Sequence, residues 1–204
     1  HPGFALFWVM GAGKTLSSIA LAGLRHKYGL IQRLLVICPT SIKGVWAKEF
    51  DRYADFPHTL HVHESGRFAT RWMDGNPFPV LVVGIEAMSV KSGPEICKEF
   101  LSGGVSMTIL DESSRIKHHN TKRTESVLEL YPESQYRLAL TGTNITQGLQ
   151  DLYPQMQFVE PKAIGEISYY SFKNKYCVMG GYEGRKIVGY TKTDILVNKI
   201  KPYC

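Results

Sequence analysis

Short apolar runs alternate with amphipathic stretches along most of the chain. Five runs of four to six residues are apolar on both faces, and they occupy residues 4–9, 34–38, 80–84, 106–110 and 136–140. Strands of this kind are typical of a parallel sheet that helices cover on both sides. The stretches between them carry apolar residues at three- and four-residue spacing, as amphipathic helices do, at residues 15–28, 42–53, 95–101 and 121–130. This alternation predicts an α/β fold with a doubly wound, mostly parallel sheet.

The pattern changes near residue 60 and again after residue 143. Leu60 and Val62 alternate with histidines at residues 58–63, which predicts an edge strand. The last part of the chain carries two helical pieces, a Gly-rich hairpin or loop and a final helix, at residues 149–159, 168–176, 177–190 and 194–200. Because this part has few aliphatic residues, it makes a poor independent core. We therefore expect one lobe at residues 1–145 and a small basic helical and hairpin appendage of that lobe at residues 146–204.

Composition narrows the class of protein. The 204 residues are 44% apolar and 21% charged, without a low-complexity tract, which excludes disorder and fibrous repeats. The longest apolar run, residues 4–10, is far shorter than the roughly 20 residues of a membrane span and lacks the flanks of a signal peptide. We therefore expect a soluble protein with no membrane partner. The 4 cysteines form no C-x-x-C pair, which favours a reducing compartment over a zinc ribbon or a disulfide framework.

The net charge of +6 is concentrated near the C-terminus. Residues 161–204 carry eight Lys and Arg against three Asp and Glu, a balance of +5. Such an asymmetry is typical of a polyanion contact, although a solvated basic face would have the same composition.

A phosphate-binding motif follows the first apolar run. Its residues are Met10, Gly11, Ala12, Gly13, Lys14 and Thr15. The glycines let backbone N–H groups close around phosphate oxygens, while Lys14 reaches the β- and γ-phosphates and Thr15 offers its hydroxyl to Mg²⁺. Trp8 stands where the eight-residue pattern has Gly, and a mere tight turn is the alternative. Because a Lys-Thr pair after the glycines has no packing purpose, we predict a site for ATP and Mg²⁺.

Two carboxylates end a later strand. Asp111 and Glu112 directly follow the apolar run at residues 106–110. Adjacent carboxylates are costly to crowd together without a cation nearby. Beside a phosphate-binding loop, Asp111 is expected to help hold Mg²⁺ and Glu112 to orient and deprotonate the attacking water. We therefore predict that Lys14, Asp111 and Glu112 are catalytic, with an acidic turn that caps a helix as the alternative.

A third motif ends the last apolar run. Thr141, Gly142 and Thr143 lie at the expected carboxyl edge of the sheet, where ligands bind in open α/β folds. Their hydroxyls are expected to sense the γ-phosphate, whereas an ordinary strand-to-loop turn is the alternative.

In this order, the motifs resemble the first RecA-like lobe of helicase superfamily 2, and within it the Swi/Snf-type double-stranded-DNA translocases. Residues 110–117, Leu-Asp-Glu-Ser-Ser-Arg-Ile-Lys, are similar to the family's DEAH-type motif II. Residues 38–41, Cys-Pro-Thr-Ser, continue to Trp46 and are similar to motif Ia. Residues 84–86 lie where motif Ib belongs, and residues 140–143 match motif III.

The resemblance implies an ATP-binding lobe of a DNA-dependent ATPase that hydrolyses Mg-ATP and translocates on double-stranded DNA. It implies contacts between motif Ia and the DNA backbone, for which the candidate residues are Pro39, Thr40, Ser41 and Lys43. It also implies a second helicase lobe, which supplies an arginine and is absent from these 204 residues. The compact spacing of the motifs resembles phage or bacterial members, so we expect the cytoplasm of a bacterium or an infected host, or the nucleus if the source is eukaryotic.

Three positions depart from the family pattern. Val9 stands where an acidic residue is frequent, Ser114 where His is usual and Asn144 where Pro normally follows motif III. None of them removes a phosphate or Mg²⁺ contact, so ATP chemistry is expected to survive. These departures are instead expected to affect how nucleotide state is coupled to movement on DNA.

Other functions stay open at this point. They are a different superfamily 2 motor, such as a restriction-enzyme translocase or an RNA helicase, a lobe that binds nucleotide or DNA without turnover, and a small-molecule P-loop kinase. His61 and His63 would share a strand face, but no Cys or carboxylate spacing completes a metal site. Trp46, at helical spacing from Phe50, is expected in the core instead of serving as a platform for stacked bases.

Overall fold

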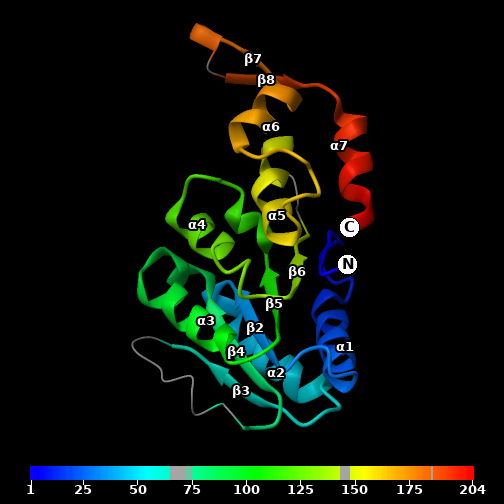
Figure 1. The fold of residues 1–204 in the computed structure, drawn as a ribbon, viewed down its shortest axis with the longest axis vertical. Helices are drawn as coiled ribbons and strands as arrows, with labels where there is room; N and C mark the ends of the chain where they lie inside the picture. The colour runs from blue at the N-terminus through cyan, green and yellow to red at the C-terminus, as the bar shows by residue number, and fades with distance from the viewer. Residues whose placement is uncertain (65–72, 74, 143–147, 185) are drawn as a thin grey trace.

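The computed structural model describes residues 1–64, 73, 75–142, 148–184 and 186–204. In this part of the chain, six parallel strands form the main sheet in the order β1-β6-β5-β2-β4-β3 (Figure 1). The predicted strands all occur, and the one with alternating histidines lies at the sheet's edge. The strands are β1 (Gly3–Leu6), β2 (Arg33–Cys38), β3 (Thr59–Val62), β4 (Pro79–Gly84), β5 (Ser106–Asp111) and β6 (Tyr136–Leu140).

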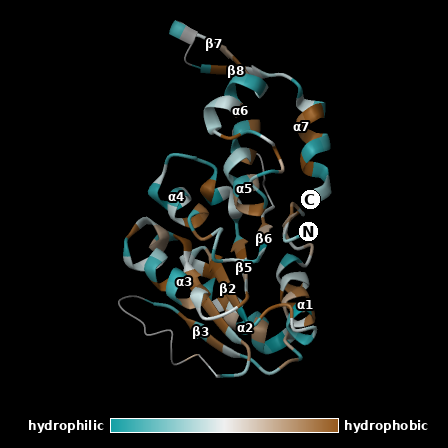
Figure 2. Cartoon of the chain, in the orientation of Figure 1, coloured by the Kyte–Doolittle hydropathy of each residue, from teal (hydrophilic) through white to brown (hydrophobic). Residues whose placement is uncertain are grey.

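Helices cover both faces of the sheet, which confirms the doubly wound fold. Along β2, Leu34 and Val36 belong to one core, whereas Leu35 and Ile37 belong to a second core on the opposite face. All four side chains are fully buried, and each such burial stabilises the fold by about 1.5–3 kcal/mol. Figure 2 shows apolar residues concentrated in the central strands, between more polar helices. The first core is closed by α1 (Lys14–Lys27) and α2 (Lys43–Tyr53), and the second by α3 (Ser92–Ser102) and α4 (Lys122–Leu128).

The C-terminal part forms the predicted helices and an antiparallel hairpin. Leu152, Phe172 and Ile200, each from a different helix, join the second core. The boundary expected between residues 145 and 146 lies outside the described residues. No helix in the described ranges is both long and apolar enough to cross a membrane. The elements are α5 (Leu152–Val159), α6 (Tyr169–Tyr176), β7 (Cys177–Gly180), β8 (Lys186–Tyr190) and α7 (Thr193–Ile200).

Short 3-10 helices follow three neighbouring strands of the sheet. They start within two residues of the ends of β2, β4 and β5, so the chain turns sharply at the carboxyl edge. These turns are η1 (Thr40–Ile42), η3 (Ile85–Ser89) and η4 (Ser113–Ile116), and three others near the C-terminus are η5 (Leu149–Asp151), η6 (Tyr182–Gly184) and η7 (Lys201–Tyr203).

The first strand is shorter than predicted. An apolar run at residues 4–9 predicts a strand of that length, but β1 ends at Leu6, where its pairing with Leu140 of β6 ends. The next residues leave the sheet, and the side chain of Val9 is 73% exposed. Phe7 still packs against the second core, but Trp8 and Val9 are exposed before the phosphate-binding loop, so their apolar character does not reflect burial.

Candidate nucleotide site and nucleic-acid face

The strand order gathers the predicted motifs at one edge of the sheet. The phosphate-binding loop follows β1, Asp111 ends β5, and Thr141 follows β6, which lies between these two strands. The carboxyl ends of parallel strands meet at the same edge, which is where open α/β sheets bind ligands. A Cβ placed on Gly142 would lie only 3.1 Å from Cγ of Met10, so Gly142 lies directly against the phosphate-binding loop.

The phosphate-binding loop has the backbone that its glycines predict. Gly11 and Gly13 have φ values of 78° and 82°, in the left-handed region that favours glycine. Trp8, in contrast, has no positive φ, so this position does not need the glycine of the eight-residue pattern. Residues 10–13 are all exposed, so the loop is open to solvent.

Lys14 and Thr15 begin α1 immediately after the loop. The ammonium group of Lys14 donates to the carbonyl oxygens of Trp8 and Val9, at 3.0 and 3.2 Å. The ammonium group therefore lies over the loop itself, where the oxygens of a triphosphate would accept its hydrogen bonds. Thr15 is half-buried in the first turn of the helix. A cavity of about 330 Å³ lies beside the loop, lined by Gly11, Gly13, Lys14, Thr15, Leu16, Val45, Glu49 and Tyr53.

Asp111 is held by two donors. Its Oδ2 accepts a hydrogen bond from Nε1 of Trp46 at 2.9 Å, and its Oδ1 accepts one from the N–H of Glu112 at 2.9 Å. Burial raises the pKa of Asp111, while these hydrogen bonds and the charge of Lys14 act in the opposite direction. The result is a fixed carboxylate, 8% exposed, that fits the role of a Mg²⁺ ligand.

Trp46 is in the core, as predicted, with 1% of its surface exposed. Its hydrogen bond to Asp111 was not predicted. The only signal in the sequence is that a buried indole N–H needs an acceptor.

Glu112 lies between the nucleotide motifs in an unusual backbone conformation. Its φ of 50° and ψ of 53° are left-handed, a strain of about 1–3 kcal/mol that proteins tolerate mainly at functional sites. Its Oε2 lies 3.5 Å from Oγ1 of Thr141, which brings the second and third predicted motifs together. Thr143, the other hydroxyl of the third motif, lies outside the described residues, as does Asn144.

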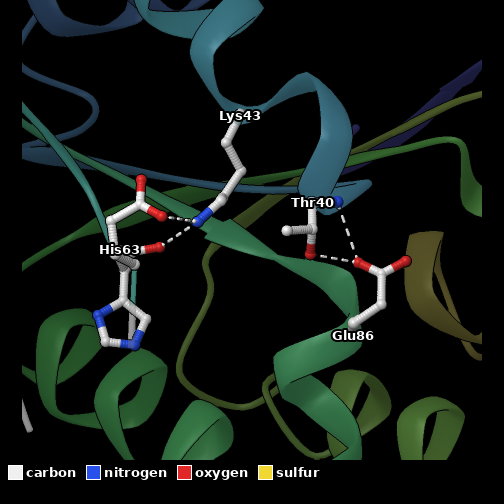
Figure 3. A network of polar contacts seen from close by, with 5 residues as sticks. Thr40, Lys43, His63 and Glu86 are labelled. Carbon is white, nitrogen blue, oxygen red and sulfur yellow. Dashed lines mark hydrogen bonds and ion pairs between the residues drawn. The ribbon is translucent and has the colours of Figure 1, made fainter. Parts of the chain in front are cut away.

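The predicted nucleic-acid residues divide into two groups. Thr40 and Ser41 are exposed at the start of η1, after the buried Pro39. Both donors of Thr40, its N–H and its hydroxyl, bind Oε2 of Glu86 at 3.0 and 2.6 Å (Figure 3). The opposite oxygen of Glu86 forms an ion pair with Arg115 at 3.1 Å. Burial by itself raises the pKa of Glu86, but the hydrogen bonds from Thr40 and the charge of Arg115 bring it below its usual range.

Lys43 does not face outward as a phosphate contact requires, which corrects that prediction. Its side chain is 6% exposed, and its ammonium group donates to the carbonyl oxygen of His63 at 2.6 Å (Figure 3). It also forms an ion pair with Glu64 at 3.1 Å. A buried ammonium group needs such partners because leaving it unpaired in the interior is costly. In this structure Lys43 therefore ties the start of α2 to the end of β3.

The chain as a whole matches a described protein family. The family model of the SNF2-related domain matches residues 2–201. The chain belongs to the SNF2-related domain family. The predicted resemblance to Swi/Snf-type ATPases is thereby confirmed.

Similar proteins and structures agree with this membership. The structure of the SNF2-related domain is similar to the Sulfolobus solfataricus SWI2/SNF2 ATPase core in complex with dsDNA, with a TM-score of 0.76 and 27% identity, over 98% of this chain and 39% of that one. This likeness confirms the predicted RecA-like α/β fold.

Two curated relatives are similar to the SNF2-related domain in sequence. Subunit snf22 of the SWI/SNF chromatin-remodeling complex from Schizosaccharomyces pombe is 32% identical over 182 residues, which are 85% of this chain and 10% of that protein. Switch 2 from Arabidopsis thaliana is 31% identical over 169 residues, 76% of this chain and 19% of that protein. The SNF2-related domain thus spans only a tenth to a fifth of these relatives. A phage or bacterial source stays a prediction.

Proposed function

We propose that this SNF2-related domain is the ATP-binding lobe of a DNA-dependent ATPase that translocates on double-stranded DNA. One observation carries the proposal: the phosphate-binding loop, Asp111 and the Glu112–Thr141 pair converge at one sheet edge in a chain similar to an ATPase core in complex with dsDNA. A tight turn or an acidic cap would not bring these motifs together. A Swi/Snf-type motor is favoured over other superfamily 2 enzymes because the family model is the SNF2-related domain and because snf22 and the Sulfolobus ATPase core carry the SWI/SNF name.

The residues of the site have distinct roles in ATP hydrolysis. Lys14 leaves the carbonyl oxygens of Trp8 and Val9 and binds the β- and γ-phosphates instead, because the phosphate oxygens carry more negative charge than the carbonyl oxygens. Thr15 and Asp111 would hold Mg²⁺, which would supply positive charge against the phosphates when bound. Glu112 takes the proton of the attacking water, and Thr141, which is fully buried beside it, responds to the γ-phosphate through Glu112.

DNA is bound through its backbone in this proposal. Thr40 and Ser41 supply exposed hydroxyl and N–H donors at the sheet edge, and Pro39 shapes the turn before them. Lys43 is left out of the contact because it is buried against Glu64. The basic C-terminal part adds a polyanion-attracting surface of balance +5. The protein acts where it meets DNA, in a bacterial cytoplasm or in a nucleus.

A second helicase lobe is the expected partner. Arginine fingers of phosphoryl-transfer enzymes contribute on the order of 10³–10⁵ in rate, and this arginine typically comes from outside the phosphate-binding loop. We therefore expect the 204-residue chain alone to bind ATP weakly and to show little DNA-stimulated hydrolysis. A longer protein that continues through a second lobe is expected to hydrolyse ATP when duplex DNA is added.

The test is an ATPase assay on both proteins, with and without duplex DNA. Brisk DNA-stimulated turnover by the 204-residue chain would show that an arginine acts in cis and would overturn the two-lobe mechanism. A longer protein that binds nucleotide but shows no turnover with any nucleic acid would reduce the lobe to a binding module. Stimulation by RNA in place of duplex DNA would favour a different superfamily 2 motor.

A further inference from the structure

Glu86 occupies both hydrogen-bond donors of Thr40. Its Oε2 accepts from the N–H of Thr40 at 3.0 Å and from the hydroxyl at 2.6 Å, so one anionic oxygen holds two donors (Figure 3). This is the geometry in which backbone and hydroxyl donors hold a phosphate oxygen. Thr40 is exposed at the turn after β2, so its surroundings are open to solvent.

The side chain of Thr40 is held in place by the backbone at Gly84. A Cβ on Gly84 would lie 2.3 Å from Oγ1 of Thr40, so the threonine side chain packs directly on the backbone at the end of β4. Only glycine allows this approach. The hydroxyl is therefore aimed at Glu86, which follows Gly84 by two residues in the same turn.

The second oxygen of Glu86 leads to the nucleotide site. Its Oε1 pairs with Nη1 of Arg115 at 3.1 Å, and Arg115 lies three residues after Glu112 in the chain. The N–H of Arg115 also donates to the carbonyl oxygen of Glu112 at 2.9 Å. Because β5, β2 and β4 are neighbours in the sheet, the contacts run along one edge from Thr40 to Glu112.

Two anions cannot share the donors of Thr40. A DNA phosphate that takes them must displace the carboxylate of Glu86, and the like charges then repel each other. The displaced carboxylate keeps Arg115, its existing partner, as a counter-charge. Before displacement, the carboxylate of Glu86 binds both Thr40 and Arg115. After displacement, it binds Arg115 alone.

We propose that Glu86 is a positioning residue that occupies the place of a DNA phosphate on Thr40 and, when DNA displaces it, shifts Arg115 and the segment that carries Glu112. The inference rests on the proposed function and deepens it. It explains how a contact with DNA at the end of β2 changes the rate of hydrolysis at the end of β5. Glu86 touches neither nucleotide nor water in this mechanism.

The test uses the Glu86→Gln variant of the protein that carries this domain, in its full length. The amide retains an acceptor for Thr40 but removes the competing charge. One unit charge about 4 Å from a phosphate in water is worth about 1 kcal/mol, so duplex DNA should bind about fivefold more tightly at low salt without nucleotide. Stimulation of ATP hydrolysis by saturating duplex should fall at the same time, because the link to Arg115 is weakened. A residue with a merely structural role would weaken DNA binding when it is changed.

The matched control is Glu129→Gln. Glu129 pairs with Lys98 at 2.8 Å and has an exposure of 60%, against 42% for Glu86, so the control removes the same charge from a similar surface pair. It should change neither DNA affinity nor stimulation by more than about twofold. In a Thr40→Val background, the gain in DNA affinity from Glu86→Gln should shrink, because one of the contested donors is gone.

The outcomes separate the two proposals. Duplex-stimulated hydrolysis by the wild-type protein together with unchanged or weaker DNA binding by Glu86→Gln would overturn the role of Glu86 and leave the proposed function intact. A tighter complex in both Glu86→Gln and Glu129→Gln would also overturn it, since general charge would then be the cause. A wild-type protein that is not stimulated by duplex would overturn the proposed function itself, and this inference with it.

Discussion

Trp46→Phe is expected to loosen the proposed Mg²⁺ site without removing any group that we propose to touch the nucleotide. The indole N–H of Trp46 donates to Oδ2 of Asp111 at 2.9 Å. Both residues are buried, with exposures of 1% and 8%. Phenylalanine keeps an aromatic ring in the core but has no donor, so one oxygen of Asp111 loses its partner.

The magnitude follows from two contributions to stability. A hydrogen bond to a charged group is worth about 1.5–3 kcal/mol, and the smaller ring leaves a void that costs about 1 kcal/mol. A total of about 3 kcal/mol should lower Tm by roughly 10 °C in a protein of this size. The second effect is chemical. Losing a hydrogen bond that orients a metal ligand typically costs 10- to 100-fold in metal affinity or activity.

The assay is a Mg²⁺ titration of DNA-stimulated ATP hydrolysis in the longer protein. Trp46→Phe should need at least about ten times more Mg²⁺ for half-maximal rate. Phe50→Leu is the control, because Phe50 is fully buried in the same core, with its ring 6.4 Å from that of Trp46, and has no polar group. It should lower Tm while the Mg²⁺ dependence stays that of the wild type. Identical Mg²⁺ curves for Trp46→Phe and wild type, despite a lower Tm, would refute the role of Trp46 in orienting Asp111.

Three further predictions concern the site and its surroundings. Lys14→Ala should weaken Mg-ATP binding, because a point charge on the phosphates is lost while the backbone donors remain; unchanged affinity in calorimetry would remove the phosphate-site assignment. Glu112→Gln should keep nucleotide binding and lose hydrolysis, because the amide stays polar but cannot take a proton, and retained turnover would place the base elsewhere. The pKa of Glu86 is lowered in the folded state, so its contribution to stability is present above the ordinary glutamate pKa of about 4.3 and is lost as the pH falls through the lower folded value. Acid unfolding should therefore depend less on pH in Glu86→Gln than in the wild type, and identical acid transitions would contradict this.

The strands were predictable because burial on both faces leaves a simple signature. All six residues of β2 are buried, and all but one of them are apolar. The exception, Arg33, donates to the carbonyl oxygens of Phe100 and Gly103, both at 2.6 Å. Those acceptors lie at the end of α3, far away in sequence. A pattern of apolar residues indicates that a strand is buried but does not identify the partners that make a buried charge acceptable.

The site was predictable in its motifs and less so in its contacts. Gly11 and Gly13 predict the left-handed turns of the loop after β1 because these backbone angles favour glycine, and the structure has them. Lys43 misled because a lysine after a strand has no local sign of direction, and its partner Glu64 comes from another strand's end. The bond between Trp46 and Asp111 joins residues 65 positions apart, which no local spacing reveals.

Strand β6 acts as a spacer between opposite charges. The loop with Lys14 follows β1 and Asp111 ends β5, and β6 lies between the two strands. Adjacent strands are about 4.8 Å apart, so the ends of β1 and β5 are separated by about 10 Å. A sheet in which these strands were neighbours would let Lys14 and Asp111 neutralise each other in the resting protein. The order of the strands instead leaves Lys14 and Asp111 with separate hydrogen-bond partners, although the charge of Lys14 still acts to lower the pKa of Asp111. In the proposed function, a phosphate would replace the partners of the cation and a metal ion would bind the anion.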